Sequence, residues 1–460
     1  MRFTHSSELP AHSPTDVFDW HERPGALERL TPPWGRVDVL ERAGGIKDGG
    51  EITIRVHRGP TSFKWRLRHR DYEYARQFCD EQVSGPLKSW LHTHSFSELP
   101  GGGTLMEDSV DLEPPLGAAG AALGPTFMNA ELGRLFRFRH RLLFMDLARH
   151  AEYAERPRLT VAITGASGLI GQNLQHFLTT GGHQVIRLVR RSSEVAPDCV
   201  YWNPATGEVD KHGLGRADAV VHLAGTPIAD GRWTDDRKRS ILRSRVDGTE
   251  LISKTMASMS GGPRVLLSSS AVGFYGDRGQ ERLDEKAQSG KGFLAEVCRA
   301  WEGATAAADA AGIRVVHVRT GVVLSPAGGA LGQMLLPFKM GVGGRLGSGK
   351  QYLSWIDLDD LVGLMHHALH TESLRGPVNA TAPNPVTNAT FSAALGRALG
   401  RPTVIPVPGF AVKAAFGQLG TEALLWGQRV VPQKAVESGY SFFYEGVEDS
   451  LRFQLGKEPE

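Results

Sequence analysis

The spacing of apolar positions changes near residue 150, and the change predicts two folds in one chain. In the first part, Phe63, Trp65 and Leu67 alternate with basic residues. A period of two is typical of a strand with one buried face. The three glycines at 101–103 predict a turn into a further strand that begins at Thr104. These patterns predict antiparallel strands joined by hairpins.

Two helices flank the predicted strands. Ser13 followed by Pro14 suits a helix start, with serine as the N-cap and proline in the first turn. A long helix is marked by apolar residues at spacings of three and four: Leu132, Leu135, Phe138, Leu142 and Met145. We therefore expect residues 1–155 to form an α+β domain in which a sheet packs on a long helix.

From residue 159 the chain alternates short apolar runs with helical segments. The runs cover residues 160–164, 184–189, 218–225, 264–270 and 314–319. Repeated strand–helix units predict an α/β fold, with a doubly wound parallel sheet between two layers of helices. Residues 151–158 are the expected linker. We assign residues 156–460 to a Rossmann domain with a C-terminal substrate lobe, mainly residues 325–460, where the strand–helix alternation fades.

The first strand of this second part ends in a glycine-rich turn. Gly165 permits the turn, Gly168 lets the backbone approach a pyrophosphate, and Gly171 lets helix and strand pack closely. The start of the next helix would offer free N–H groups to phosphates. The turn and the helix start together add three candidate cofactor-binding residues, Ser167, Leu169 and Ile170. A turn without a ligand has the same form, but a second strand about twenty residues later favours a nucleotide.

The end of the second strand predicts which nucleotide is bound. NAD sites commonly place Asp or Glu there for the ribose 2′-hydroxyl, whereas NADP sites place Arg for the 2′-phosphate. Here the strand is followed by Arg190 and Arg191, with no acid before Glu194. We expect NADP as the cofactor; the alternative is a solvated basic loop.

Further short motifs narrow the family. They are Leu223-Ala224-Gly225, the run 268–277, the segments 231–234 and 292–302, and the run 319–324. Together with the glycine turn they resemble an atypical branch of the extended short-chain dehydrogenase/reductases. This is the NAD-dependent epimerase/dehydratase, or SulA-type nucleoside-diphosphate-sugar epimerase, family. The resemblance spans roughly residues 159–455. It implies cofactor contacts from Leu223, Ala224, Gly225 and Val322.

The resemblance also implies where protons would be transferred. Related enzymes use a Tyr-x-x-x-Lys pair, with a Ser or Thr on the neighbouring strand that orients the substrate carbonyl. Ser269 or Ser270 supplies that hydroxyl. Tyr275 is the nearest substitute acid and Glu296 the next; for each of these two a structural role is the alternative.

The Tyr-x-x-x-Lys pair itself is missing. Two registers are open, and both lack an ionisable group at the Tyr position: Phe293 with Val297, or Leu294 with Cys298. The cofactor cradle is thus predicted to be intact while the usual proton-transfer pair is absent.

A basic and aromatic insertion follows the third strand of this half. Its members are Arg232, Trp233, Lys238, Arg243 and Arg245. It could bind a substrate phosphate or shield the nicotinamide; the alternative is a solvated helix face.

The first domain resembles the START-like helix-grip fold of the polyketide cyclase/dehydrase group. This resemblance implies a cavity for a hydrophobic ligand, and a filled core is the alternative. His92 and His94 share one face of a strand and could chelate a metal. No third ligand is evident beside them, so no metal site is expected.

Composition argues against several classes of partner and site. The net charge of +2 calls for neither nucleic acid nor an anionic membrane. Cys79, Cys199 and Cys298 are scattered and suggest neither a disulfide framework nor a zinc site. No secretory signal and no apolar run of about 18 residues is found, so we expect a cytoplasmic protein.

These patterns lead to two functional hypotheses. The first is an NADP-dependent oxidoreductase or epimerase that acts on a small substrate, nucleotide-linked or not. The second is a non-catalytic NADP-binding sensor or scaffold whose first domain binds a hydrophobic ligand. The missing Tyr-x-x-x-Lys pair favours the second, and the serine run and the substrate lobe favour the first.

Overall fold

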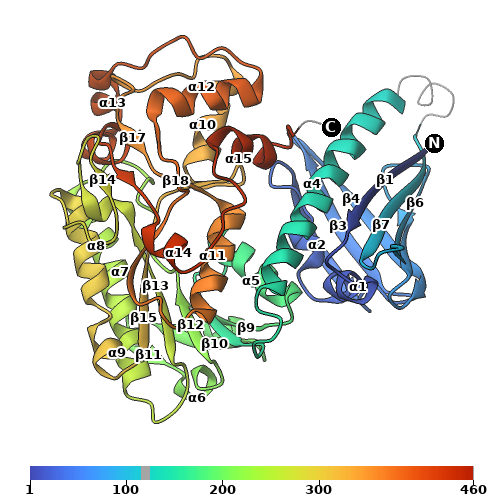
Figure 1. Cartoon of the computed structure of the whole chain (residues 1–460), viewed down its shortest axis with the longest axis horizontal. Helices are drawn as coiled ribbons and strands as arrows, with labels where there is room; N and C mark the ends of the chain where they lie inside the picture. The colour runs from blue at the N-terminus through green and yellow to red at the C-terminus, as the bar shows by residue number, and fades with distance from the viewer. Residues whose placement is uncertain (116–124, 459–460) are drawn as a thin grey trace. The chain divides into compact units, whose positions relative to one another are not determined.

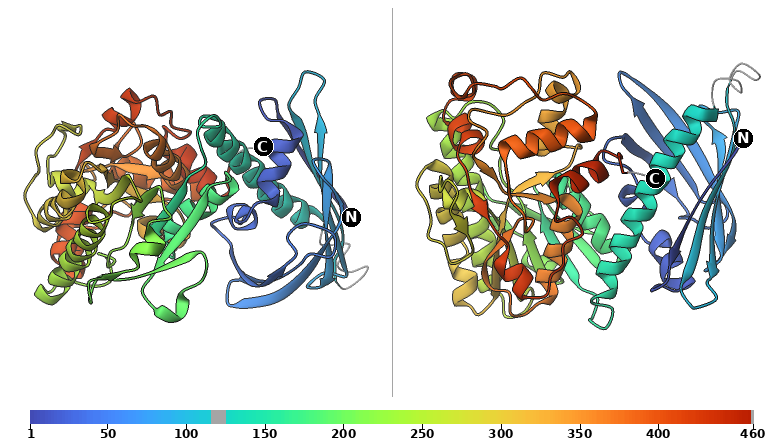
Figure 2. Two further views of the ribbon diagram at one scale, coloured as in Figure 1. Left: turned by 90° about the horizontal axis from the view of Figure 1, so that it is seen from below. Right: turned by 45° about the horizontal axis from the view of Figure 1, so that its top comes forward.

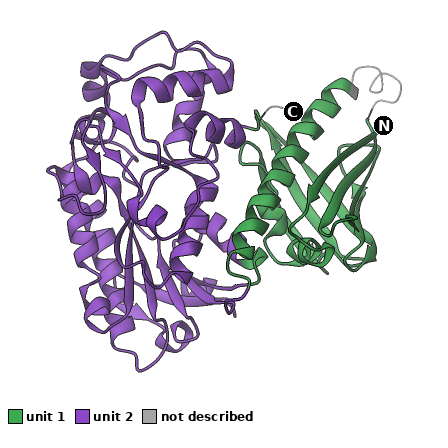
Figure 3. Ribbon diagram, viewed as in Figure 1, with its two compact units in different colours: residues 1–154, 179–182, 456–460 green, residues 155–178, 183–455 purple. Residues whose placement is uncertain are grey.

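The computed structural model describes residues 1–115 and 125–458, and it separates the chain into two compact units (Figure 3). Unit 1 consists mainly of residues 1–154. Unit 2 consists of residues 155–178 and 183–455.

Unit 1 is built on a seven-stranded antiparallel sheet with the order β1-β7-β6-β5-β4-β3-β2. The strands are β1 (Arg2–Leu9), β2 (Arg36–Ala43), β3 (Glu51–Arg58), β4 (Thr61–Glu73), β5 (Gln77–Ser84), β6 (Ser89–Glu98) and β7 (Thr104–Glu113). The predicted hairpin strands are confirmed, and the glycines at 101–103 join β6 to β7.

Among residues 1–115 and 125–154, three helices accompany this sheet: α1 (Pro14–Glu22), α2 (Ala26–Arg29) and α4 (Pro125–Ala151). The α1 N-cap is Ser13, as predicted, and Asp16 completes a capping box with it. Figure 2 shows the long helix α4 lying across the sheet. The core between sheet and helices includes Phe18, Phe78 and Leu143. The α+β architecture expected for this half is confirmed.

Unit 2 contains an eight-stranded sheet with the order β11-β10-β9-β8-β12-β13-β15-β19. Its strands are β8 (Thr160–Thr164), β9 (Gln184–Val189), β10 (Cys199–Asn203), β11 (Glu208–Val209), β12 (Ala219–His222), β13 (Val265–Ala271), β15 (Arg314–Thr320) and β19 (Gly376–Ala380). All neighbours are parallel except β10 and β11. This is the predicted doubly wound sheet.

Both faces of the sheet are buried, because alternate side chains of each strand enter different cores. Val161 and Val221 pack with α5 (Leu169–Thr180) and α11 (Leu358–His370). Ala162 and Val220 face the opposite side, with α7 (Asp235–Ala257) and α9 (Ala306–Ala310) (Figure 1). The near-continuous apolar runs of these strands follow from this two-sided burial.

The remaining elements of unit 2 connect the sheet or follow it. They are η1 (Ser192–Glu194), α6 (Lys211–Leu214), η2 (Val272–Tyr275), β14 (Arg282–Leu283), α8 (Phe293–Gly303), β16 (Val322–Leu324), α10 (Gly329–Lys339), β17 (Tyr352–Leu353), β18 (Trp355–Asp357), β20 (Val386–Thr387), α12 (Asn388–Leu399), α13 (Gly409–Phe416), η3 (Gly420–Leu425), β21 (Arg429–Val430), α14 (Gln433–Glu437) and α15 (Val447–Gln454).

The stretch after residue 325 is not a separate lobe throughout. Helix α11 packs on one face of the sheet, and β19 extends the sheet beside β15.

No helix among the described residues is both long and apolar enough to cross a membrane.

Candidate cofactor site

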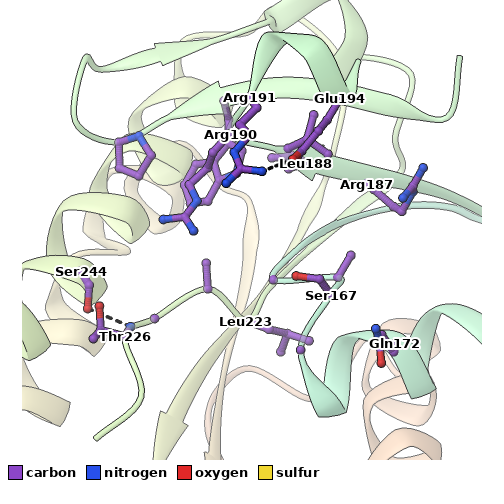
Figure 4. Close-up of a pocket in the computed structure, with 18 of the residues that line it drawn as sticks. Ser167, Gln172, Arg187, Leu188, Arg190, Arg191, Glu194, Leu223, Thr226 and Ser244 are labelled. Atoms are coloured by element: carbon purple, nitrogen blue, oxygen red, sulfur yellow. Dashed lines mark hydrogen bonds and ion pairs between the residues drawn. The ribbon is translucent and has the colours of Figure 1, made fainter. Parts of the chain in front are cut away.

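A cleft of about 920 Å³ opens at the carboxyl ends of β8, β9 and β12 (Figure 4). Strand β8 is flanked by β9 on one side and β12 on the other, so the strand order reverses there. Such a switch point leaves a crevice outside the strand ends, where nucleotides bind. These sequence-predicted residues line the cleft: Gly165, Ser167, Gly168, Arg190, Arg191, Leu223, Ala224 and Gly225.

Close backbone contacts explain two of the three glycines in the turn. Gly165 has a φ of 69°, and a Cβ there would lie 3.0 Å from the Leu223 carbonyl carbon. A Cβ on Gly171 would lie 2.2 Å from the Gly165 carbonyl oxygen. A Cβ on Gly168 would meet only the Gly165 carbonyl oxygen, at 3.3 Å. Gly168 is exposed in the cleft, so its free side suits a close-lying ligand.

The start of α5 brings backbone donors to the same place. The first N–H groups of a helix have no partner within it. Ser167 and Gly168 are exposed just before the helix begins at Leu169. The side chains of Leu169 and Ile170 pack against the core instead, so only their backbone could serve a ligand. Predicted Val322 lies on β16 and does not line this cleft.

Arginines form one wall of the cleft, where β9 ends. Figure 4 shows Arg190, Arg191 and Glu194 close together on this wall. Arg191 pairs with Glu194 at 3.2 Å, and Arg187 pairs with Asp198 at 3.0 Å. No acidic partner of Arg190 is found within the described part of the chain. Arg190 is therefore the cation most available to an incoming phosphate.

A buried hydrogen-bond network fixes the floor of the cleft. Thr164 Oγ1 accepts the N–H groups of Leu223 and Ala224 at 3.0 and 3.2 Å, and it lies 2.8 Å from His222 Nδ1. Burial lowers the pKa of His222 to about 4, so this imidazole is neutral at pH 7. The network ties the ends of β8 and β12 together.

Helix α7 supplies lining residues that the sequence reasoning missed. They are Ser244 and Asp247, beside Arg243, which the sequence had included in the insertion. Ser244 Oγ accepts the N–H of Thr226 at 3.1 Å. The spacing of 243, 244 and 247 places these side chains on one helix face, which is the signal that could have found them.

The rest of the insertion has structural contacts. Trp233 is buried and donates to the Ile228 carbonyl at 2.8 Å. Arg232 donates to the carbonyls of Ala414 and Ala415. The Arg245 guanidinium lies 4.9 Å from the centre of the Trp301 ring. Of this group, Arg243 alone lines the described cleft.

The two candidate serines lie at the end of β13 but differ in environment. Ser270 is buried, and its hydroxyl donates to Glu302 Oε1 at 2.7 Å. Ser269 is half-buried and faces the other side of the strand. Glu302 also pairs with Arg319 at 2.8 Å. Ser270 is therefore part of a structural ion-pair network, and Ser269 is the freer hydroxyl.

Like the two serines, Tyr275 and Glu296 do not line the cleft. Tyr275 is fully buried; its hydroxyl donates to Asn379 at 2.7 Å and accepts from Arg319 at 3.0 Å. Burial raises the pKa of Tyr275 to about 12, against the lowering effect of Arg319. Glu296 is exposed on the surface of α8. This geometry favours the structural alternative for both residues.

Helix α8 carries the positions that Tyr-x-x-x-Lys would occupy. Its Phe293, Leu294 and Val297 join an apolar cluster with Trp233 and Leu419. Its N-terminus is capped by a carboxylate from far along the chain: Glu422 accepts the N–H groups of Phe293 and Leu294 at 3.1 and 2.9 Å. The helix is thus held in place for packing, without an ionisable pair at these positions.

The parallel sheet, the glycine turn at its switch point and the arginine wall define a dinucleotide-binding α/β protein of the extended short-chain dehydrogenase/reductase type. Residues 161–379 match the model of the NAD dependent epimerase/dehydratase family. An epimerase family protein of Mycobacterium bovis is 46% identical over 293 residues, which are 64% of this chain and 96% of that protein. The chain belongs to this epimerase family.

Two solved structures extend the comparison. A nucleoside-diphosphate sugar epimerase from Corynebacterium glutamicum is 35% identical, with a TM-score of 0.81, over 99% of this chain and 90% of that one. The human epimerase family protein SDR39U1 (isoform2), solved with NADPH, is 34% identical, with a TM-score of 0.58. This match covers 64% of this chain and 98% of the human one. Residues 10–135 match the polyketide cyclase/dehydrase and lipid transport model, and residues 407–453 match a domain of unknown function. Both predicted resemblances are confirmed.

Proposed function

We propose that the chain binds NADP and catalyses an oxidoreductase or epimerase reaction on a small, nucleotide-linked substrate. The observation that carries the cofactor choice is Arg190 at the end of β9, exposed in the cleft and without an acidic partner in the described residues. The related human protein was solved with NADPH, which agrees with this choice. Gly168 and the start of α5 would hold the pyrophosphate.

Bound NADP supplies or accepts the hydride. The side chains of this protein then have two tasks, which are to orient the substrate oxygen and to exclude water from the reacting atoms. Ser269 is the residue we propose for the first task, because Ser270 already donates to Glu302. The apolar cluster with Phe293 and Leu294 is suited to the second task. In the absence of a Tyr–Lys pair, turnover at neutral pH is expected to be slow.

The test follows NADPH absorbance at 340 nm with a panel of carbonyl compounds, and follows sugar nucleotides by NMR in D₂O. We expect Ser269→Ala to lower turnover at unchanged NADPH affinity, while Ser270→Ala serves as the matched control. Tyr275→Phe tests the residue that the sequence favoured as acid. If Tyr275→Phe abolishes turnover at unchanged stability, the tyrosine acts in catalysis and the structural assignment fails.

The apolar replacement of the Tyr–Lys pair favours a second candidate, an NADP-binding sensor or scaffold whose unit 1 holds a hydrophobic ligand. A cavity of about 360 Å³ in unit 1, lined by Ile52, Ile54 and Leu67 among others, supports this ligand. Tight NADPH binding without turnover of any carbonyl or sugar nucleotide would favour the sensor.

A further inference from the structure

A row of polar side chains, of which Asp80 is half-buried and the histidines are buried, crosses the sheet of unit 1 at the cavity. His69 on β4 pairs in register with Asp80 on β5, and Asp80 pairs with His92 on β6. His94 lies two residues further along β6, on the same face. His92 and His94 are 2% and 6% exposed, so this polar group sits inside the domain and not on its surface. All four residues line the cavity.

Three potential metal ligands converge in this row. Asp80 Oδ2 lies 3.4 Å from His92 Nδ1 and 3.6 Å from His94 Nε2. The ligand atoms of the three residues all lie within 4.8 Å of one another. Two ligands bound tetrahedrally at about 2.1 Å from one zinc ion are about 3.4 Å apart. The spacing of Asp80 from both imidazoles therefore fits a shared ion better than a short hydrogen bond.

A second carboxylate holds the opposite edges of both imidazoles. Asp108 Oδ1, on β7, lies 2.8 Å from His92 Nε2 and 2.6 Å from His94 Nδ1. Its other oxygen lies 2.6 Å from His140 Nε2 on α4. A carboxylate accepts hydrogen bonds, so the bond between Asp108 and His92 favours a proton on His92 Nε2. The His92 Nδ1 that faces Asp80 is then a lone-pair donor, as metal binding requires.

The donor set of this row is one carboxylate oxygen and two imidazole nitrogens. Imidazole ligands select transition metals over Mg²⁺ or Ca²⁺.

We propose that unit 1 binds one divalent transition metal ion, with zinc as the reference ion, through Asp80, His92 and His94. His69 Nε2 lies 2.8 Å from Asp80 Oδ1 and orients this ligand, and Asp108 orients the two histidines. Three protein ligands leave a fourth position, which faces the cavity and can take water or a donor atom of a bound ligand. The third ligand was hidden in the sequence because it lies on the adjacent strand.

The test uses the full-length untagged protein, stripped with a chelator and titrated with Zn²⁺ by calorimetry and with Co²⁺ by visible absorption. We expect a saturating site with a tetrahedral Co²⁺ spectrum, which His92→Gln, His94→Gln and Asp80→Asn each abolish. Asp108→Asn should weaken Zn²⁺ binding about 10- to 100-fold through loss of ligand orientation. The matched control is His57→Gln, which removes a histidine of the same sheet that pairs with Asp38 at 2.8 Å.

A measurement on the unmodified protein tests the proposal even if the variants fail to fold. Added Zn²⁺ should raise the melting temperature of the stripped protein, because a ligand that binds only the folded state stabilises it. If Zn²⁺ and Co²⁺ do not bind the stripped protein, the proposal fails and the cluster is held by protonated histidines. Binding that persists in the His92 and His94 variants would also overturn it, since the ion would then lie elsewhere.

Discussion

Arg190 should decide the preference of this protein for NADPH over NADH. The change to make is Arg190→Ala, alone and combined with Arg191→Ala. Both side chains are exposed on the arginine wall of the cleft, so their removal should leave the fold intact. NADH lacks the 2′-phosphate and should bind the variants as it binds the parent.

The magnitude follows from the partners of the two arginines. A hydrogen bond to a charged group contributes about 1.5–3 kcal/mol. Loss of the Arg190 contact should therefore raise the Kd for NADPH about 10- to 150-fold, with solvent screening favouring the lower end. Arg191 shares its charge with Glu194 at 3.2 Å, so Arg191→Ala should cost less. Glu194→Gln should tighten NADPH binding by up to about fivefold, because it removes a negative charge near the phosphate.

Calorimetry with NADPH and NADH, at low and high salt, measures these effects. The NADPH advantage should shrink as salt rises, since exposed charges are screened. The control is Arg264→Ala, an exposed arginine just before β13, at the opposite edge of the sheet. Equal NADPH and NADH affinities in the parent would refute the assignment. An Arg190→Ala variant that loses both cofactors equally would show that Arg190 supports the fold and not the phosphate.

Three further predictions concern stability. Gly171→Ala should lower the melting temperature sharply or prevent folding, because its Cβ would lie 2.2 Å from the Gly165 carbonyl oxygen. The control is Gly303→Ala, whose Cβ would meet no atom within 4 Å and which should leave the melting temperature unchanged or raise it. Acid should destabilise unit 2 partly through His222: its pKa is about 4 when folded and 6.5 when unfolded, so the unfolded state gains the proton first as pH falls. Between pH 7.5 and 4, the free energy of unfolding of the His222→Gln variant should fall by about 3 kcal/mol less than that of the parent protein. Denaturant unfolding measures this difference, and the same pH dependence in parent and variant would contradict the prediction. Residues 1–155 should unfold cooperatively as an isolated fragment; a melt without a transition would mean that their core needs the rest of the chain.

Local rules account for most of the fold. The period-two alternation at Phe63–Leu67, the Ser13 cap and the apolar runs that became β8, β9, β12, β13 and β15 each depend on residues close in sequence. The glycine turn was predictable for the same reason, since a tight turn and a helix start are set within about seven residues. The place of helix α11 against the sheet was not predicted, because the packing partner of a helix lies far away in the sequence.

The chemistry of the sites depended on contacts between distant residues. From the sequence, Ser269 and Ser270 were equal candidates and Tyr275 was the nearest substitute acid. Pairing with Glu302, Arg319 and Asn379 places Ser270 and Tyr275 in a buried network. His92 and His94 lacked a third ligand until the sheet brought Asp80 beside them from the neighbouring strand. By itself the sequence determined the elements and the cofactor cradle, because spacing and turn chemistry are local. Only the tertiary structure decided which polar groups are free for chemistry, because burial and hydrogen-bond partners come from segments far apart in the chain.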